Sequence, residues 1–174
     1  MITEPEVLFV ERFVEDPDSL LHSLLAETTW DEQIYARLTA SFGVPYNYSG
    51  MTYSEVPMPG YLQDVCAAIN ERLRFAPNNC LVNNYVEGGS RMGFHADSIE
   101  ELVPGTGVAV VSLGAMRTLT FRRTEERDIR WGCPLPHGSL LYMPPEAQSD
   151  WQHGVLKEAG VGQRVSLSFR ALRR

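Results

Sequence analysis

Two histidines and an aspartate are the residues of this sequence best suited to bind a metal ion. His95 and Asp97 stand two positions apart, and on an extended strand such side chains point to the same side. His153, in the segment DWQHG, can add a third ligand from a distant strand. Two imidazoles and one carboxylate on one face of an ion leave its other positions open, as in non-haem Fe(II) sites. His137 is the alternative third ligand; we favour His153 because an arginine-bearing strand follows it.

The segment RVSLSFR near the C-terminus alternates strictly between polar and apolar residues. Its polar side chains share one face: Arg164, Ser166, Ser168 and Arg170. An arginine inside a protein is costly unless it pairs with an anion, and a guanidinium fork suits a carboxylate. Asn83 and Tyr85, at positions i and i+2 of an apolar strand, can hydrogen-bond the same anion. We expect an interior anion site, although an edge strand with solvated arginines would show the same alternation.

Two helices are expected before a run of short strands. Capping residues at 16–19 precede a leucine stripe, and a second apolar stripe of helical period runs from Pro59 to Leu73. From Cys80 onward the strand candidates are CLVNNYV, GVAVVSLG, RTLTFRR, GSLLYM and RVSLSFRAL. This order predicts an α+β, mostly β domain with a closed or double-sheet architecture. Periodicity does not distinguish a jelly roll from another sandwich.

The 174 residues suit one domain, and their formal net charge of -7 argues against a non-specific duplex-DNA binder. A cluster of arginines supplies local positive charge, either as a nucleic-acid contact or as a solvated hairpin: Arg117, Arg122, Arg123, Arg127 and Arg130. The N-terminus does not resemble a signal peptide, no stretch is long and apolar enough to cross a bilayer, and the three cysteines match no zinc or disulfide pattern. We therefore expect a cytoplasmic protein with reduced thiols and no membrane partner.

The chain resembles the AlkB family of Fe(II)/2-oxoglutarate dioxygenases. The matching segments run in family order from Arg37 to Arg170: RLTASFG, YNYSGMTY, CLVNNYVEGGSRMGFHAD, ELVPG, VAVVSLGAMRTLTFRR, PHGSLLYM, DWQHGVLKE and RVSLSFR. The resemblance implies a double-stranded β-helix (a cupin-like jelly roll) with N-terminal helices packed on the outside. It implies one domain over 1–174, with helices and a substrate lid at about 1–78 and the catalytic jelly roll at about 79–174.

The resemblance also implies roles for individual residues. Fe(II) would be held by His95, Asp97 and His153, and Arg164 would bind the distal carboxylate of the co-substrate 2-oxoglutarate with help from Tyr85. Further co-substrate contacts would come from Asn83, Ser166 and Arg170. The substrate pocket would include Tyr46, Tyr48, Ser49, Tyr53 and Ile99. The family often has an acidic residue where Ile99 stands, and its RxNLTFR motif appears here with Ser166 in place of Asn, so recognition of the base stays open.

The function that the resemblance implies is oxidative demethylation of N-alkylated bases in DNA or RNA. Such an enzyme would use Fe(II), 2-oxoglutarate and O₂, and would release formaldehyde, succinate and CO₂. We expect a monomer that acts on single-stranded nucleic acid, because an acidic protein has little with which to hold a duplex. The alternative is an AlkB-like hydroxylase or demethylase of a small molecule, such as a nucleoside or metabolite, or of a protein.

Overall fold

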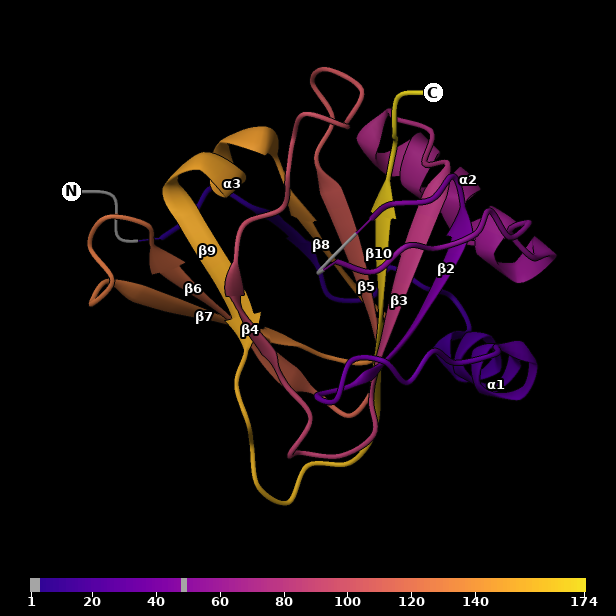
Figure 1. Ribbon diagram of the computed structural model, residues 1–174, viewed down its shortest axis with the longest axis horizontal. Coiled ribbons are helices and arrows are strands. Elements are labelled where there is room, and N and C mark those ends of the chain that lie inside the picture. The colour runs from indigo at the N-terminus through magenta and orange to yellow at the C-terminus, as the bar shows by residue number, and fades with distance from the viewer. Residues whose placement is uncertain (1–3, 48–49) are drawn as a thin grey trace.

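Two antiparallel sheets face each other, with the two longer helices on the outside of the larger one (Figure 1). The computed structural model describes residues 4–47 and 50–174. The larger sheet has the strand order β1-β8-β5-β10-β3-β2 and the smaller sheet the order β4-β9-β6-β7. The strands are β1 Leu8–Val10, β2 Leu38–Gly43, β3 Asn79–Tyr85, β4 Met92–His95, β5 Val108–Gly114, β6 Arg117–Arg123, β7 Arg130–Leu135, β8 Ser139–Met143, β9 Trp151–Val155 and β10 Arg164–Arg170. This architecture confirms the expected jelly-roll-like, mostly β fold.

The two expected helices are present close to their predicted bounds. Helix α1 (Pro17–Glu27) begins after Asp16, whose carboxylate accepts a hydrogen bond from the backbone N–H of Ser19 at 3.1 Å. Helix α2 (Gly60–Leu73) follows the predicted start at Pro59. A third helix, α3 (Pro145–Asp150), has six residues and was not predicted. None of the described helices is long and apolar enough to cross a membrane.

Strand β10 separates the core beneath the helices from the space between the sheets. It lies between β5 and β3, and every residue of it is buried. Val165, Leu167 and Phe169 belong to the cluster that also contains the buried faces of α1 and α2. The polar residues of β10 therefore point the other way, toward the smaller sheet. This arrangement confirms the prediction that they face the interior.

Candidate metal centre and adjoining cavity

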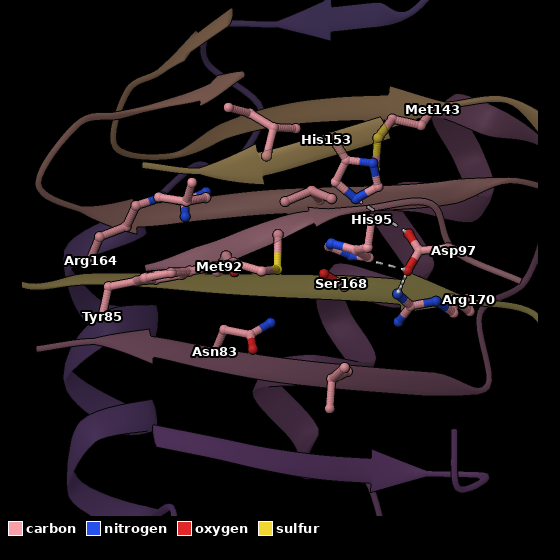
Figure 2. Close-up of a pocket in the computed structure, with 15 residues that line it drawn as sticks. Asn83, Tyr85, Met92, His95, Asp97, Met143, His153, Arg164, Ser168 and Arg170 are labelled. Atoms are coloured by element: carbon pink, nitrogen blue, oxygen red, sulfur yellow. Dashed lines mark hydrogen bonds and ion pairs between the residues drawn. The ribbon is translucent and has the colours of Figure 1, made fainter. Parts of the chain in front are cut away.

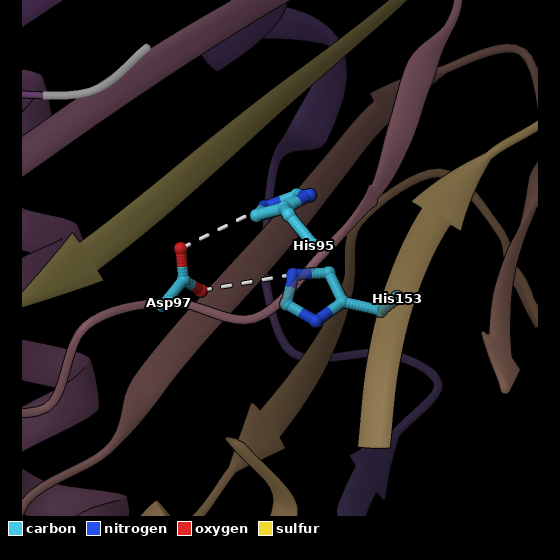
Figure 3. A group of neighbouring side chains, drawn as sticks. All are labelled: His95, Asp97 and His153. Atoms are coloured by element: carbon cyan, nitrogen blue, oxygen red, sulfur yellow. Dashed lines mark ion pairs between the residues drawn. The ribbon is translucent and has the colours of Figure 1, made fainter. Parts of the chain in front are cut away.

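Three side chains from two adjacent strands and a loop meet between the sheets (Figure 3). His95 ends β4 and is the register partner of His153 in β9; Asp97 follows β4 by two residues. Nε2 of His95 lies 3.8 Å from Oδ1 of Asp97, and Nε2 of His153 lies 3.6 Å from Oδ2 of the same carboxylate. One ligand atom from each residue lies within 4.8 Å of the other two. This spacing suits one metal ion bound by two imidazoles and a carboxylate.

The charges of Asp97 and His153 match what a metal requires. Burial favours the protonated form of Asp97, but the attraction of Arg170 and then of His153 holds the pKa of this carboxyl below its ordinary value. Burial lowers the pKa of His153 to about 4, although Asp97 opposes that shift. At neutral pH the site therefore presents an ionised carboxylate and a neutral imidazole, which are the forms that bind metals.

Neighbouring groups fix the orientation of these ligands. Nδ1 of His95 lies 2.9 Å from the carbonyl oxygen of Gly93, which favours the tautomer with its proton on Nδ1 and its lone pair on Nε2, the nitrogen nearer Asp97. The backbone N–H of Asp97 donates to Oε1 of Gln148 at 2.8 Å. Gln148 was not anticipated from the sequence, because it lies in the unpredicted helix α3.

A cavity extends from this cluster to Arg164 at its far end (Figure 2). Its described polar lining contains Asn83, Tyr85, His95, Asp97, His153, Arg164, Ser166, Ser168 and Arg170. Arg164 is 1% exposed, and its Nη2 donates to Oγ of Ser112 at 2.8 Å. Its Nε and Nη1 make no hydrogen bond within the described part of the chain. A buried guanidinium with two unused donors is suited to bind a carboxylate brought by a ligand.

Arg37 is a further residue that the sequence did not single out as functional. Its Nε donates to Oδ1 of Asn83 at 2.7 Å, and its Nη1 donates to the carbonyl oxygen of Arg91 at 3.3 Å. Oδ1 of Asn83 accepts from Arg37, so the amide nitrogen is the donor end of this side chain, and Asn83 is one of the residues that line the cavity. The contact with Asn83 spans 46 residues, and no local pattern predicts a pairing over such a separation.

The candidate substrate-pocket residues occupy different places. Tyr46 is buried, with the guanidinium carbon of Arg170 4.1 Å from its ring centroid. The hydroxyl of Tyr53 donates to Oγ1 of Thr39 at 2.9 Å, beside a separate groove along β2. Ile99 is 41% exposed. None of these three is among the described residues that line the cavity, and Tyr48 and Ser49 lie outside the described residues.

The alternative histidine, His137, lies in another environment. Its Nδ1 accepts a hydrogen bond from the backbone N–H of Gly114 at 2.9 Å, and its Nε2 lies 2.8 Å from Oδ1 of Asp18. These contacts attach α1 to the loop before β8. His137 is not part of the metal-ligand cluster found among the described residues, which contains His153 instead.

Comparisons with known proteins give relatives for both the sequence and the fold. Mouse DNA oxidative demethylase ALKBH2 is 34% identical over 138 residues, which cover 75% of this chain and 58% of the relative. Human alpha-ketoglutarate-dependent dioxygenase alkB homolog 3 is 32% identical over 181 aligned positions, which cover 91% of this chain and 63% of the relative. The chain thus spans less than two thirds of either relative.

The solved structure of OsALKBH1 has the same fold. It superposes with a TM-score of 0.70 and covers 98% of this chain and 100% of its own, at 18% sequence identity. In addition, residues 18–170 match the 2OG-Fe(II) oxygenase superfamily, whose description names the metal and the co-substrate that the cavity fits. The chain therefore belongs to the 2OG-Fe(II) oxygenase superfamily and is an AlkB-like member of it.

Proposed function

We propose that the protein is a 2-oxoglutarate-dependent dioxygenase that removes alkyl groups oxidatively from nucleobases. The observation that carries the proposal is one cavity with three metal-binding side chains at one end and the unpaired donors of Arg164 at the other. A keto acid with a distal carboxylate suits both ends. His95, Asp97 and His153 would hold Fe(II), and Arg164 would bind the C5 carboxylate of 2-oxoglutarate.

The protein's own residues contribute binding, orientation and shelter from water. When bound, iron and 2-oxoglutarate supply the oxidation of a substrate C–H bond by O₂, which on an N-methyl group ends in formaldehyde and the free base. Tyr85 lies beside Arg164, with the guanidinium carbon 5.2 Å from its ring centroid, and so helps to shape the carboxylate end. Arg170, 3.1 Å from Oδ1 of Asp97, keeps that ligand ionised and in place.

A nucleic-acid substrate is supported by the names of the relatives and by the outer face of the smaller sheet. On that face the guanidinium carbon of Arg122 lies 4.2 Å, and that of Arg130 5.5 Å, from the ring centroid of Phe94. Arg122 and Arg130 are register partners across β6 and β7. No acidic partner contacts either arginine among the ion pairs of the described residues. Neighbouring cations beside an aromatic ring suit a phosphate and a stacked base.

The negative charge of the chain does not oppose this assignment. Residues 1–34 contain nine carboxylates and one arginine, a formal charge of -8, while the remaining 140 residues contain thirteen and fourteen and so carry +1. The acidic segment includes β1 and α1, and α1 packs on the outside of the larger sheet (Figure 1). A few arginines can neutralise only a few phosphates, so we propose a single-stranded substrate.

The experiment supplies the protein with Fe(II), 2-oxoglutarate and O₂ and measures formaldehyde. Its substrates are single-stranded oligonucleotides with 1-methyladenine or 3-methylcytosine, the corresponding duplexes, the free methylated nucleosides and unmodified oligonucleotides. Formaldehyde from the methylated single strands and not from the controls supports the proposal. The Arg122→Gln/Arg130→Gln variant should bind oligonucleotides more weakly and with a smaller salt dependence, yet keep its basal consumption of 2-oxoglutarate.

A small-molecule substrate is the second candidate, and Ile99 is the residue that favours it. An exposed isoleucine stands where the family often has an acidic residue, so a base-recognising contact is missing there. An enzyme for free nucleosides would produce formaldehyde or a hydroxylated product from them and would show no salt-dependent affinity for oligonucleotides. That result would overturn the nucleic-acid proposal and leave the cavity chemistry intact.

A further inference from the structure

Arg117 is a second fully buried arginine, and it binds two loops rather than solvent. It is 1% exposed, although the sequence groups it with the surface arginines of the neighbouring hairpin. Its Nη1 donates to the carbonyl oxygen of Glu87 at 3.4 Å, and its Nη2 donates to the carbonyl oxygens of Ser90, at 2.9 Å, and Leu156. Its Nε lies 3.7 Å from Oε2 of Glu158, a residue whose side chain is 51% exposed.

These acceptors belong to the two connections that flank the carboxylate end of the cavity. Tyr85 is the last residue of β3, and the connection 86–91 follows it; Arg164 is the first residue of β10, and the connection 156–163 precedes it. The guanidinium carbon of Arg117 also lies 5.7 Å from the ring centroid of Tyr85, the ring that Arg164 contacts at 5.2 Å. One buried side chain is therefore bonded to both loops and lies over the tyrosine between them.

The backbones of the two connections are packed against each other with no room to spare. The N–H of Glu158 donates to the carbonyl oxygen of Gly88 at 2.9 Å. A Cβ at Gly88 would collide with the carbonyl group of Glu158, so a glycine is required for this approach. The two loops therefore lie in close backbone contact, and the hydrogen bonds of Arg117 to both of them stabilise this arrangement.

We propose that Arg117 is a positioning residue for the carboxylate end of the 2-oxoglutarate site, an inference that rests on the function proposed above. By bridging the two connections it keeps Tyr85 and Arg164 oriented toward the bound carboxylate. Its positive charge also adds to the attraction for a dianion, since the carboxylate that pairs with it among the described residues, that of Glu158, is half exposed and screened by solvent. Arg117 itself does not line the cavity.

The test compares two ligands that differ at the distal end alone. 2-Oxoglutarate and 2-oxopentanoate share the keto acid head and the chain length, and 2-oxopentanoate has no distal carboxylate. Their dissociation constants are measured by anaerobic calorimetry on the Fe(II) protein for wild type, Arg117→Lys, Arg117→Gln and Glu158→Gln. Arg117→Gln should weaken 2-oxoglutarate at least tenfold and 2-oxopentanoate less than twofold. Arg117→Lys, which keeps the charge but loses the planar fork, should lie between, and Glu158→Gln should match wild type within twofold.

Two results would overturn the role of Arg117: unchanged binding of 2-oxoglutarate by its variants, or an equal loss of both ligands, which marks a purely structural residue. If Arg117→Gln fails to fold, the selectivity of Arg117→Lys between the two ligands decides in the same way. The calorimetry contains no nucleic acid, so the measured dissociation constants do not depend on which substrate the enzyme oxidises. A wild-type protein that fails to bind 2-oxoglutarate refutes the proposed function itself, whereas a binding wild type with indifferent Arg117 variants refutes this inference alone.

Discussion

Replacing Arg164 with methionine should separate binding of the co-substrate from stability of the fold. In the protein without co-substrate this guanidinium is buried and donates from Nη2 to Ser112, while its Nε and Nη1 have no hydrogen-bond partner among the described residues. Arg164→Met removes a buried charge and leaves one serine hydroxyl without its donor. Exchanging a buried ion pair for apolar side chains is often neutral or stabilising by about 1–4 kcal/mol, and a buried charge without its counterion is costlier still than a paired one. The melting temperature of the variant should therefore equal or exceed that of wild type.

The affinity of Arg164→Met for 2-oxoglutarate, by contrast, should be much lower than that of wild type. A carboxylate that occupies the two unused donors gains two charge-assisted hydrogen bonds, each worth about 1.5–3 kcal/mol. Their loss corresponds to about 3–6 kcal/mol, or a dissociation constant higher by roughly a hundredfold to ten-thousandfold. Arg164→Lys should fall between, because an ammonium keeps the charge without the bidentate geometry.

The assay is anaerobic calorimetry of the Fe(II) protein with 2-oxoglutarate, together with a thermal melt of the metal-free protein. 2-Oxopentanoate is the control ligand, and its affinity should be nearly the same for wild type and variant. A dissociation constant of Arg164→Met for 2-oxoglutarate within threefold of wild type would refute the assignment of the carboxylate end. A large fall in melting temperature would show instead that Arg164 is already paired in the free protein.

Three further predictions concern the metal ligands, their support and the core. His153→Ala should lose tight Fe(II) binding, measured as bound metal after gel filtration, while His137→Ala keeps it; the reverse result would contradict the choice of third ligand. Gln148→Ala should lower metal affinity by about 10–100-fold, because the backbone N–H of Asp97 loses its hydrogen-bond partner. Competition with a chelator measures this affinity, and a change of less than about twofold would argue against a supporting role for Gln148. Leu24→Ala, at a fully buried position, should lower the free energy of unfolding, measured by urea titration, by about 2–5 kcal/mol. The control Leu25→Ala, at a position 37% exposed, should lower it by less than about 1 kcal/mol.

Features with a strong local period could be predicted from the sequence. The alternation in β10 predicted which residues share each face, because a strand has a period of two residues. In the structure one face meets the apolar core and the other lines the cavity. Helices α1 and α2 were predictable because each combines a start signal with an apolar stripe. Each of these predictions uses residues that are neighbours in the sequence.

Long-range contacts were beyond such reasoning. Arg37 reaches Asn83 over 46 residues, and Arg117 reaches carbonyl groups 27–39 residues away. On β6, Arg117 shares a face with the buried Leu119 and Phe121, whereas Arg122 lies five positions later, on the opposite face, beside Phe94. The two-residue period separates the faces of these two arginines, but it does not tell which backbone carbonyl groups Arg117 meets at its end of β6. That information resides in the tertiary packing, not in the composition of the segment.

Strand β10 joins the stability of the fold to the geometry of the site. Its apolar residues complete the core beneath the helices, and its polar residues include Arg164 at the co-substrate end and Arg170 beside Asp97 at the metal end. A slip of one residue in its pairing with β3 and β5 would turn both arginines into the apolar core and bring Val165, Leu167 and Phe169 into the cavity. Both errors are costly, so the hydrophobic core fixes the register, and the register fixes the two ends of the cavity relative to each other. The same packing that stabilises the larger sheet therefore pre-organises the site for one ligand length.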